Sequence, residues 1–327
     1  MEHLTAAELK VINNSTRELD SAVSLGTIIQ NIIDNLTSEG TPVNAVNAGK
    51  ILTIADVVID GETVTINNPV IAGANVYEFL TDVAQSKSAT TNIAVNIEAS
   101  ATKASRTLTV DTQPTSGNTM TVGTKVYTFV PVGTANADGE ISIGADLATA
   151  KLAIVAAING TDSVNDPHPL VSAGAFGAND ACILTALLGG SAGTAIATTE
   201  TFTAETNIFA GATLAGGADC SAQNAVTALV AAITASDTQG VGAVDGDGDT
   251  VELTADTAGT AGNDIVIGKV MANATFAGGA TKLSGGVDGT VGLLGDTEVD
   301  ASYLYVCTAD NTVSDKNWRR ISVGAAY

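Results

Sequence analysis

The sequence predicts an α+β protein that is mainly β, and three observations support this fold class. Ala, Thr, Val and Gly are the prevalent residues, with 34 Gly and only 4% aromatic residues in a chain of 327. Thr and Val suit strands with one solvated face, and glycine is typical of turns. In short segments apolar and polar residues alternate at period two, as in strands. The same series of segments occurs twice in the chain. A chain of this length is expected to form two or three domains.

Residues 5–37 are predicted to be helical, within an N-terminal assembly segment of residues 1–37. Thr5 is a candidate N-cap, with Glu8 completing a capping box. Two apolar stripes follow, one of Leu9, Ile12, Leu19 and Val23, the other of Leu25, Ile29, Ile32 and Leu36. Such stripes need a partner, so we expect assembly with sister chains or another protein; the alternative is packing on the chain's own β domains. Residues 38–49, rich in Gly, Pro, Asn and Ala, form a predicted linker.

A repeat of strand-like segments begins after this linker. The matched pairs are Leu52-Thr53-Ile54 with Leu108-Thr109-Val110, Thr63-Val64-Thr65-Ile66 with Thr119-Met120-Thr121-Val122, Val76-Tyr77-Glu78-Phe79 with Val126-Tyr127-Thr128-Phe129, and Val95-Asn96-Ile97 with Ile141-Ser142-Ile143. The second copy continues into a predicted helix from Leu147 to Ile158. The first copy has no helix at this point.

The missing helix and strand of the first copy occur only after the second copy ends. Val230-Ala231-Ala232-Ile233 matches Val155-Ala156-Ala157-Ile158, and Leu253-Thr254-Ala255 matches Leu184-Thr185-Ala186. We therefore predict that one module, residues 106–217, is inserted in another, residues 50–105 plus 218–286. Such insertion requires the interrupted chain ends to lie close together at a surface loop. Each module would be a β-rich α+β sandwich with one Ala-rich helix.

Residues 287–327 are predicted to form a C-terminal β-hairpin. Its strands would be Tyr303–Thr308 and Asn317–Val323. Because two strands alone are marginal in water, we expect the hairpin to dock on a module or to be completed by other copies. The aromatic and basic residues of this hairpin are predicted assembly contacts, with the hairpin's own core as the alternative: Tyr303, Tyr305, Trp318 and Arg319.

The charge of the chain disfavours two kinds of partner. Lys and Arg number 13 against 35 Asp and Glu, a formal net charge of −22. Nucleic acid and anionic membrane surfaces both need clustered cations, so neither is expected as a partner. The start of the chain has neither a basic nor an apolar signal region, so we expect assembly in a host cytoplasm. Three widely spaced cysteines are predicted to be free buried thiols.

No catalytic pattern accompanies the two histidines, and we expect a protein that is not an enzyme and needs no cofactor. His168 lies between prolines and has no nucleophile elbow beside it. The glycine runs lack the lysine of a phosphate-binding loop. The sequence leaves open a pair of catalytic carboxylates like that of a glycosidase. Such enzymes usually bind sugars on aromatic side chains, however, and this chain has a single Trp.

One weak candidate for a calcium site stands out. Asp245, Asp247 and Asp249 alternate with glycine, and Asp256 occupies the position of the last ligand in an EF-hand loop. Thr250 replaces the glycine that such a loop needs for its turn. A plain β-turn is therefore the favoured interpretation.

The C-terminal strands carry a family resemblance. The segment Asp300–Ala309, with Tyr303-Leu304-Tyr305-Val306-Cys307, followed by Trp318-Arg319-Arg320, resembles the ending of many phage head-fibre and tail-fibre proteins, where a D-x-x-Y-L-Y-V-C strand precedes a W-[KR]-R strand. Here the intervening loop is longer. The segment Thr121–Phe129 and the Val-Ala-Ala-Ile helix also resemble repeats of phage virion proteins. The resemblance implies a virion role, usually as a homotrimer.

Together these observations predict a structural component of a phage virion that is exposed on the particle. A capsid decoration or head-fibre protein is favoured, with the chain itself and a major capsid or other virion protein as partners. A tail fibre or receptor-binding protein, which would contact a host-surface ligand, is the first alternative. A cell-surface adhesin or S-layer protein is the second.

Overall fold

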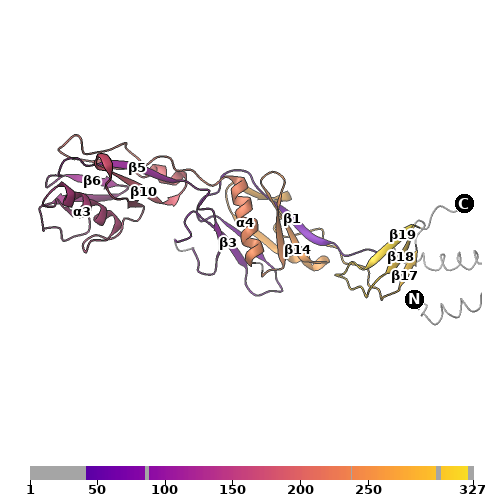
Figure 1. Cartoon of the computed structure of the whole chain (residues 1–327). Coiled ribbons are helices and arrows are strands. Elements are labelled where there is room, and N and C mark those ends of the chain that lie inside the picture. Colours follow the sequence, from indigo (N-terminus) through magenta and orange to yellow (C-terminus); the bar gives the residue numbers. More distant parts are fainter. Residues whose placement is uncertain (1–41, 85–87, 237, 300–302, 323–327) are drawn as a thin grey trace, which may run out of the picture. The chain divides into compact units, whose positions relative to one another are not determined.

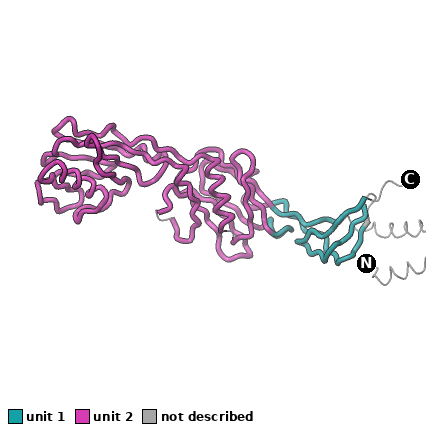
Figure 2. The backbone as a smooth tube through the Cα atoms, viewed as in Figure 1, with its two compact units in different colours: residues 1–48, 257–263, 284–327 teal, residues 49–256, 264–283 magenta. Residues whose placement is uncertain are grey.

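The computed structural model describes residues 42–84, 88–236, 238–299 and 303–322. The predicted N-terminal helical segment, with Leu9, Ile12, Leu19, Ile29, Ile32 and Leu36, lies outside the described residues. The chain divides into two compact units (Figure 2). One comprises Gly49–Asp256 and Asp264–Leu283, and the other comprises Met1–Ala48, Thr257–Asn263 and Ser284–Tyr327. The fold is α+β and mainly β, as predicted.

The first β module consists of two four-stranded sheets, ordered β13-β14-β1-β16 and β15-β2-β3-β4. Both sheets combine strands that lie before and after the central part of the chain. The first sheet contains β1 (Asn47–Ile54), β13 (Val241–Gly246), β14 (Thr250–Ala258) and β16 (Ala274–Phe276). The second contains β2 (Thr63–Asn67), β3 (Asn75–Leu80), β4 (Ile93–Asn96) and β15 (Val266–Val270).

The second β module is continuous in sequence and also has two four-stranded sheets, ordered β9-β10-β5-β12 and β11-β6-β7-β8. The first contains β5 (Lys103–Thr109), β9 (Val171–Ala173), β10 (Ala181–Gly189) and β12 (Ile208–Phe209). The second contains β6 (Thr119–Val122), β7 (Lys125–Val130), β8 (Glu140–Ser142) and β11 (Thr198–Glu200).

The two modules have the same strand order, and the equivalent strand pairs described below run in the same directions. In each module the third and fourth strands pair in parallel, Phe79 opposite Val95 in one and Phe129 opposite Ile141 in the other. Val241 lies opposite Ala255 just as Val171 lies opposite Ala186. Segments that match in sequence thus occupy equivalent positions, and one fold occurs twice in the chain.

A single Ala-rich helix closes one side of each module, between the edge strands of its two sheets. Helix α3 (Leu147–Asn159) packs on β8 and β9, and helix α4 (Ala222–Ser236) packs on β4 and β13 (Figure 1). Helix α3 begins at Asp146, whose carboxylate accepts the N–H of Thr149 in a capping box, and ends at Gly160 with φ of 62°. Its predicted range, 147–158, is confirmed to within one residue.

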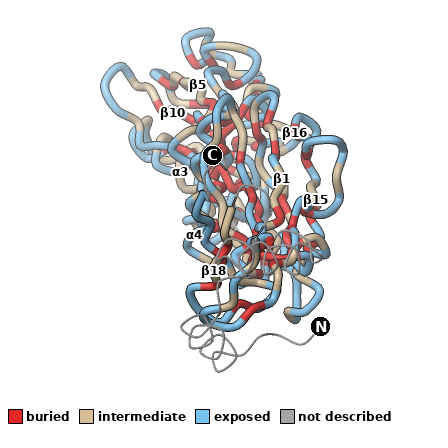
Figure 3. Tube along the Cα trace, turned by 90° about the vertical axis from the view of Figure 1, so that its right-hand side faces the viewer, coloured by how far each residue is buried: buried red, intermediate tan, exposed pale blue. Residues whose placement is uncertain are grey.

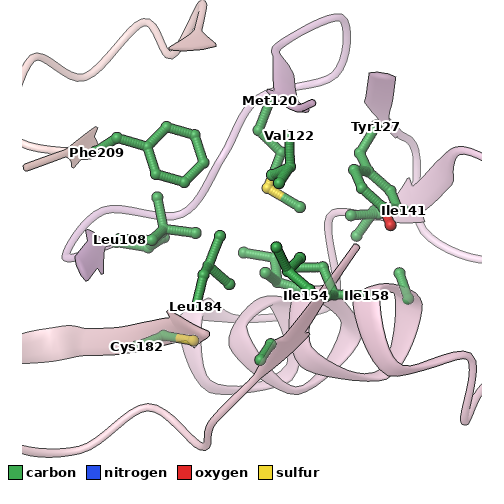
Figure 4. Close-up of a cluster of buried hydrophobic side chains, with 14 of the residues drawn as sticks. Leu108, Met120, Val122, Tyr127, Ile141, Ile154, Ile158, Cys182, Leu184 and Phe209 are labelled. Carbon is green, nitrogen blue, oxygen red and sulfur yellow. The ribbon is translucent and has the colours of Figure 1, made fainter. Parts of the chain in front are cut away.

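The core of the second module explains why its strands alternate. Along β6 and β10 buried and more exposed residues follow each other at period two. In the tube of Figure 3 the exposed stretches are mainly the loops. The buried side chains meet between the two sheets and α3 (Figure 4), and they include Leu108, Met120, Tyr127, Ile154 and Leu184. Truncating one such Leu or Ile to Ala costs about 2–5 kcal/mol.

The second module joins the first through two adjacent antiparallel segments. Thr102 and Ala218 exchange backbone hydrogen bonds of 2.8 and 3.1 Å, so the entry and the exit lie side by side. Val46 and Val287 do the same for the first module, at 2.8 and 3.1 Å. The turns at Gly190 and Gly259 bond to these pairings, since the N–H of Gly190 donates to Thr102 and that of Gly259 to Val46. We call each pairing together with its turn a joint.

The C-terminal segment forms a three-stranded antiparallel sheet, β17-β18-β19. Its strands are β17 (Thr297–Val299), β18 (Tyr303–Cys307) and β19 (Trp318–Ser322). The predicted hairpin is present as β18 and β19. The third strand was not foreseen, because Thr297–Val299 is short and shows no alternation.

Candidate assembly surface

One face of the C-terminal sheet holds a small core. Tyr305, Cys307 and Trp318 are buried there, and Tyr303 packs against them half-buried. The indole Nε1 of Trp318 donates a hydrogen bond of 2.8 Å to the backbone oxygen of Thr290. Trp318 and Tyr305 therefore contribute to the sheet's own core, and the assembly role expected of them stays a prediction. The guanidinium carbon of Arg320 lies 4.6 Å from the centre of the Tyr303 ring.

The opposite face of this sheet is open. Side chains alternate along a strand, and Leu304 lies opposite Ile321, Val306 opposite Arg319, and Thr297 opposite Val306. Ile321 is 58% exposed, and Leu304 and Val306 are only half-buried. We call Thr297, Leu304, Val306, Arg319 and Ile321 the open face. Of the predicted assembly residues, Arg319 lies on it.

The first described residues of the chain are fixed beside β19. Asn44 makes two hydrogen bonds with the backbone of Trp318: its Oδ1 accepts the N–H at 3.1 Å and its Nδ2 donates to the carbonyl at 3.2 Å. Backbone bonds also join Thr290 N–H to Val43 and Ala45 N–H to Asp315. Residues 43–45 are therefore fixed at the edge of the C-terminal sheet.

The structure separates the four carboxylates of the weak calcium candidate. Asp247 and Asp249 lie in the turn between β13 and β14, where Gly248 and Asp249 have φ of 66° and 55°. Asp256 pairs with Gly240 at the other end of the hairpin, six residues beyond Thr250, which is about 20 Å along a strand. Asp245 accepts hydrogen bonds from Gln223. The β-turn interpretation fits this geometry and the calcium loop does not.

His168 is a structural residue in the described fold. It is 2% exposed, its Nε2 lies 3.0 Å from the backbone oxygen of Val122, and its Nδ1 accepts the N–H groups of Leu170 and Val171. Burial lowers its pKa, the hydrogen bond to Val122 opposes this, and the charge of Lys125 adds to the lowering. The ring thus holds the loop before β9 against β6 as a neutral imidazole.

A shallow hollow of about 500 Å³ includes two carboxylates, Asp60 and Glu62. Both already have backbone donors. Glu62 accepts the N–H groups of Ile59 and Ala272, and Asp60 accepts the N–H and hydroxyl of Thr81. Their oxygens bind the backbone of neighbouring loops, so this pair does not resemble a catalytic acid and base.

The cysteines fit the sequence prediction of free, buried thiols. Cys182, Cys220 and Cys307 form no disulfide. Burial raises the pKa of Cys182 to about 11, which keeps the thiol protonated and unreactive at neutral pH.

Within the described ranges, no three His, Cys, Asp or Glu side chains come together in a way that could hold a metal ion. No helix in the same ranges is long and apolar enough to cross a membrane. The chain matches no protein-family model, no curated protein and no solved structure.

Proposed function

We propose that this protein is a structural component of a phage virion, a capsid decoration or head-fibre protein that projects from the particle. The observation that carries the proposal is the C-terminal sheet. Its β18 and β19 are the segments that resemble phage fibre endings, and in the structure they pair as strands of one sheet, with Cys307 opposite Trp318. The resemblance implies assembly into a virion, in which copies of the chain and a capsid protein would be the partners.

The use of polar groups supports a structural rather than a catalytic role. The carboxylates of Asp60, Glu62, Asp219 and Asp288 all accept backbone N–H groups, and His168 is saturated on both ring nitrogens. Groups that are committed in this way stabilise loops and are not free to transfer protons. The large negative charge would keep many copies on one particle soluble.

Immunogold electron microscopy of particles from cells that express the gene in its natural neighbourhood tests the proposal. Label distributed over the head, with peptide copy numbers in the hundreds by mass spectrometry of purified particles, is the expected result. Label only at the tail would favour the tail-fibre alternative. Label on the cell surface without particles, or release of reducing ends from host glycans by the purified protein, would contradict the proposal.

A further inference from the structure

The open face of the C-terminal sheet is an apolar surface that none of the described residues covers. Leu304, Val306 and Ile321 lie on it in adjacent positions, and Ile321 is more than half exposed. The sheet already buries its other face around Trp318. The apolar side chains on the open face would still gain stability from a further layer, because burial removes their area from water. A second layer is therefore expected over the open face.

Position and length point to one occupant. We infer that the second apolar stripe of the N-terminal segment, Leu25, Ile29, Ile32 and Leu36, packs on the open face of the same chain. Asn44, which is bound to β19, lies eight positions after Leu36, and eight extended steps along the chain reach about 26 Å. A helix over residues 25–36 would be about 18 Å long, similar to the ~17 Å of a five-residue strand.

Charge supports the same pairing. Residues 1–41 contain six carboxylates against two cations. Arg319 lies on the open face and forms no ion pair with a carboxylate of the described residues. The acidic segment and Arg319 would therefore attract each other.

The short connection favours the same chain over a second copy. A segment tethered by so short a connection has an effective concentration on the order of millimolar at the sheet, far above that of another molecule in dilute solution. The first stripe, with Leu9, Ile12 and Leu19, then stays available for an external partner. The inference stands independently of whether that partner belongs to a virion.

Cysteine cross-linking in the full-length chain tests this packing. Ile321→Cys is combined with Ile29→Cys or Ile32→Cys on the stripe, and with Gln30→Cys or Asp34→Cys on the opposite side of the predicted helix. A short thiol cross-linker should join the stripe positions within one chain, in preference to the opposite positions. Cross-links mainly between chains, or equal yields for both sides of the helix, would overturn the inference.

Hydrogen exchange gives a second readout that needs no cross-linker. In the wild type, residues 25–36 should exchange about tenfold or more slowly than in the Ile321→Glu variant, because the charge disrupts the apolar contact. Val132→Glu is the matched control, because Val132 is also β-branched and equally exposed, and it should leave this segment unchanged. Equal exchange of residues 25–36 in the wild type and in Ile321→Glu, with the C-terminal sheet still protected, would contradict the packing.

Discussion

The carboxylate of Asp219 accepts two hydrogen bonds from Ser191, one from its backbone N–H at 2.7 Å and one from its hydroxyl at 2.6 Å. Asp288 makes the same contacts with Thr260, at 2.6 Å from the N–H and 2.9–3.0 Å from the hydroxyl. Both pairs stand at the joints, directly after Ala218 and Val287. The same polar contact thus stabilises the exit of each module.

Removing either carboxylate should weaken its joint. Asp219→Ala and Asp288→Ala each leave a turn N–H without its acceptor, and we expect a loss of about 1–2 kcal/mol in the free energy of unfolding. Urea denaturation followed by circular dichroism measures this loss. Asp264→Ala is the control, because its ion pair with Lys282 is exposed on both sides and should change stability by less than about 0.5 kcal/mol. Equal effects at Asp264 and Asp219 would contradict a special role for the joints.

Two glycines at the joints should not tolerate a side chain. A Cβ at Gly217 would collide with the backbone oxygen of Gly190, and a Cβ at Gly286 would collide with that of Gly259. Because backbone atoms must move, Gly217→Ala and Gly286→Ala should each cost about 2–3 kcal/mol or prevent folding. Gly177→Ala is the control, since nothing lies within 4 Å of its added Cβ. Thermal unfolding of the three variants compares them, and an unchanged melting temperature for Gly217→Ala would refute this prediction.

His168 should make the second module sensitive to acid. The folded state favours the neutral ring, whose pKa lies below the ordinary value of 6.5, whereas the unfolded chain takes up the proton near 6.5. The free energy of unfolding should therefore fall as the pH drops below about 6.5, by at most about 1.4 kcal/mol per pH unit. Denaturation at pH 7.5 and 5 measures this change.

The first module has a glutamine in the loop that corresponds to that of His168, which suggests His168→Gln as the control variant. There Gln239 connects the corresponding loop to the end of β2, accepting the N–H of Asn68 at 2.7 Å and donating to Gly73 at 2.9 Å. Glutamine can replace both hydrogen-bonding functions of a neutral histidine but does not titrate. His168→Gln should fold and lose the pH dependence attributed to this ring. An unaltered pH dependence would show that other groups cause it.

The two equivalent tyrosines should respond in opposite ways to loss of the hydroxyl. The hydroxyl of Tyr127 is buried and has no hydrogen-bond partner among the described residues, whereas that of Tyr77 accepts from Asn75 at 3.2 Å. Tyr127→Phe should leave stability unchanged or raise it by up to about 2 kcal/mol, and Tyr77→Phe should lower it by about 1 kcal/mol. Chemical denaturation of both variants provides the comparison. A larger loss for Tyr127→Phe would imply a bound water at that hydroxyl.

The repeat was predictable from sequence because equivalent strands keep the same buried residues. Tyr77 and Tyr127, or Leu253 and Leu184, occupy the same inward positions in the two modules. The short strands were missed for the opposite reason. Ile208–Phe209 and Thr297–Val299 have too few residues to show a period, and their pairing depends on distant segments.

The aromatic cluster near the C-terminus shows a limit of a different kind. The sequence indicated that Tyr305 and Trp318 form either an assembly contact or a core. It could not choose between them, because a buried core and an interface favour the same side chains. Only the strand register shows that these two face inward, while Leu304 and Ile321, which are less distinctive in sequence, face outward. The interactions of Asp219 and Asp288 were also missed, since a lone aspartate after a pair of glycines has no specific pattern.

The adjacent ends at Thr102 and Ala218 have an evolutionary consequence. Neighbouring strands lie about 5 Å apart, so recombination could exchange the segment between these two residues for any domain whose own termini are similarly close. The host module would keep its sheets and its joint. The inserted module could thus diversify by replacement as a whole, while the part that carries the N- and C-terminal segments stays under separate selection.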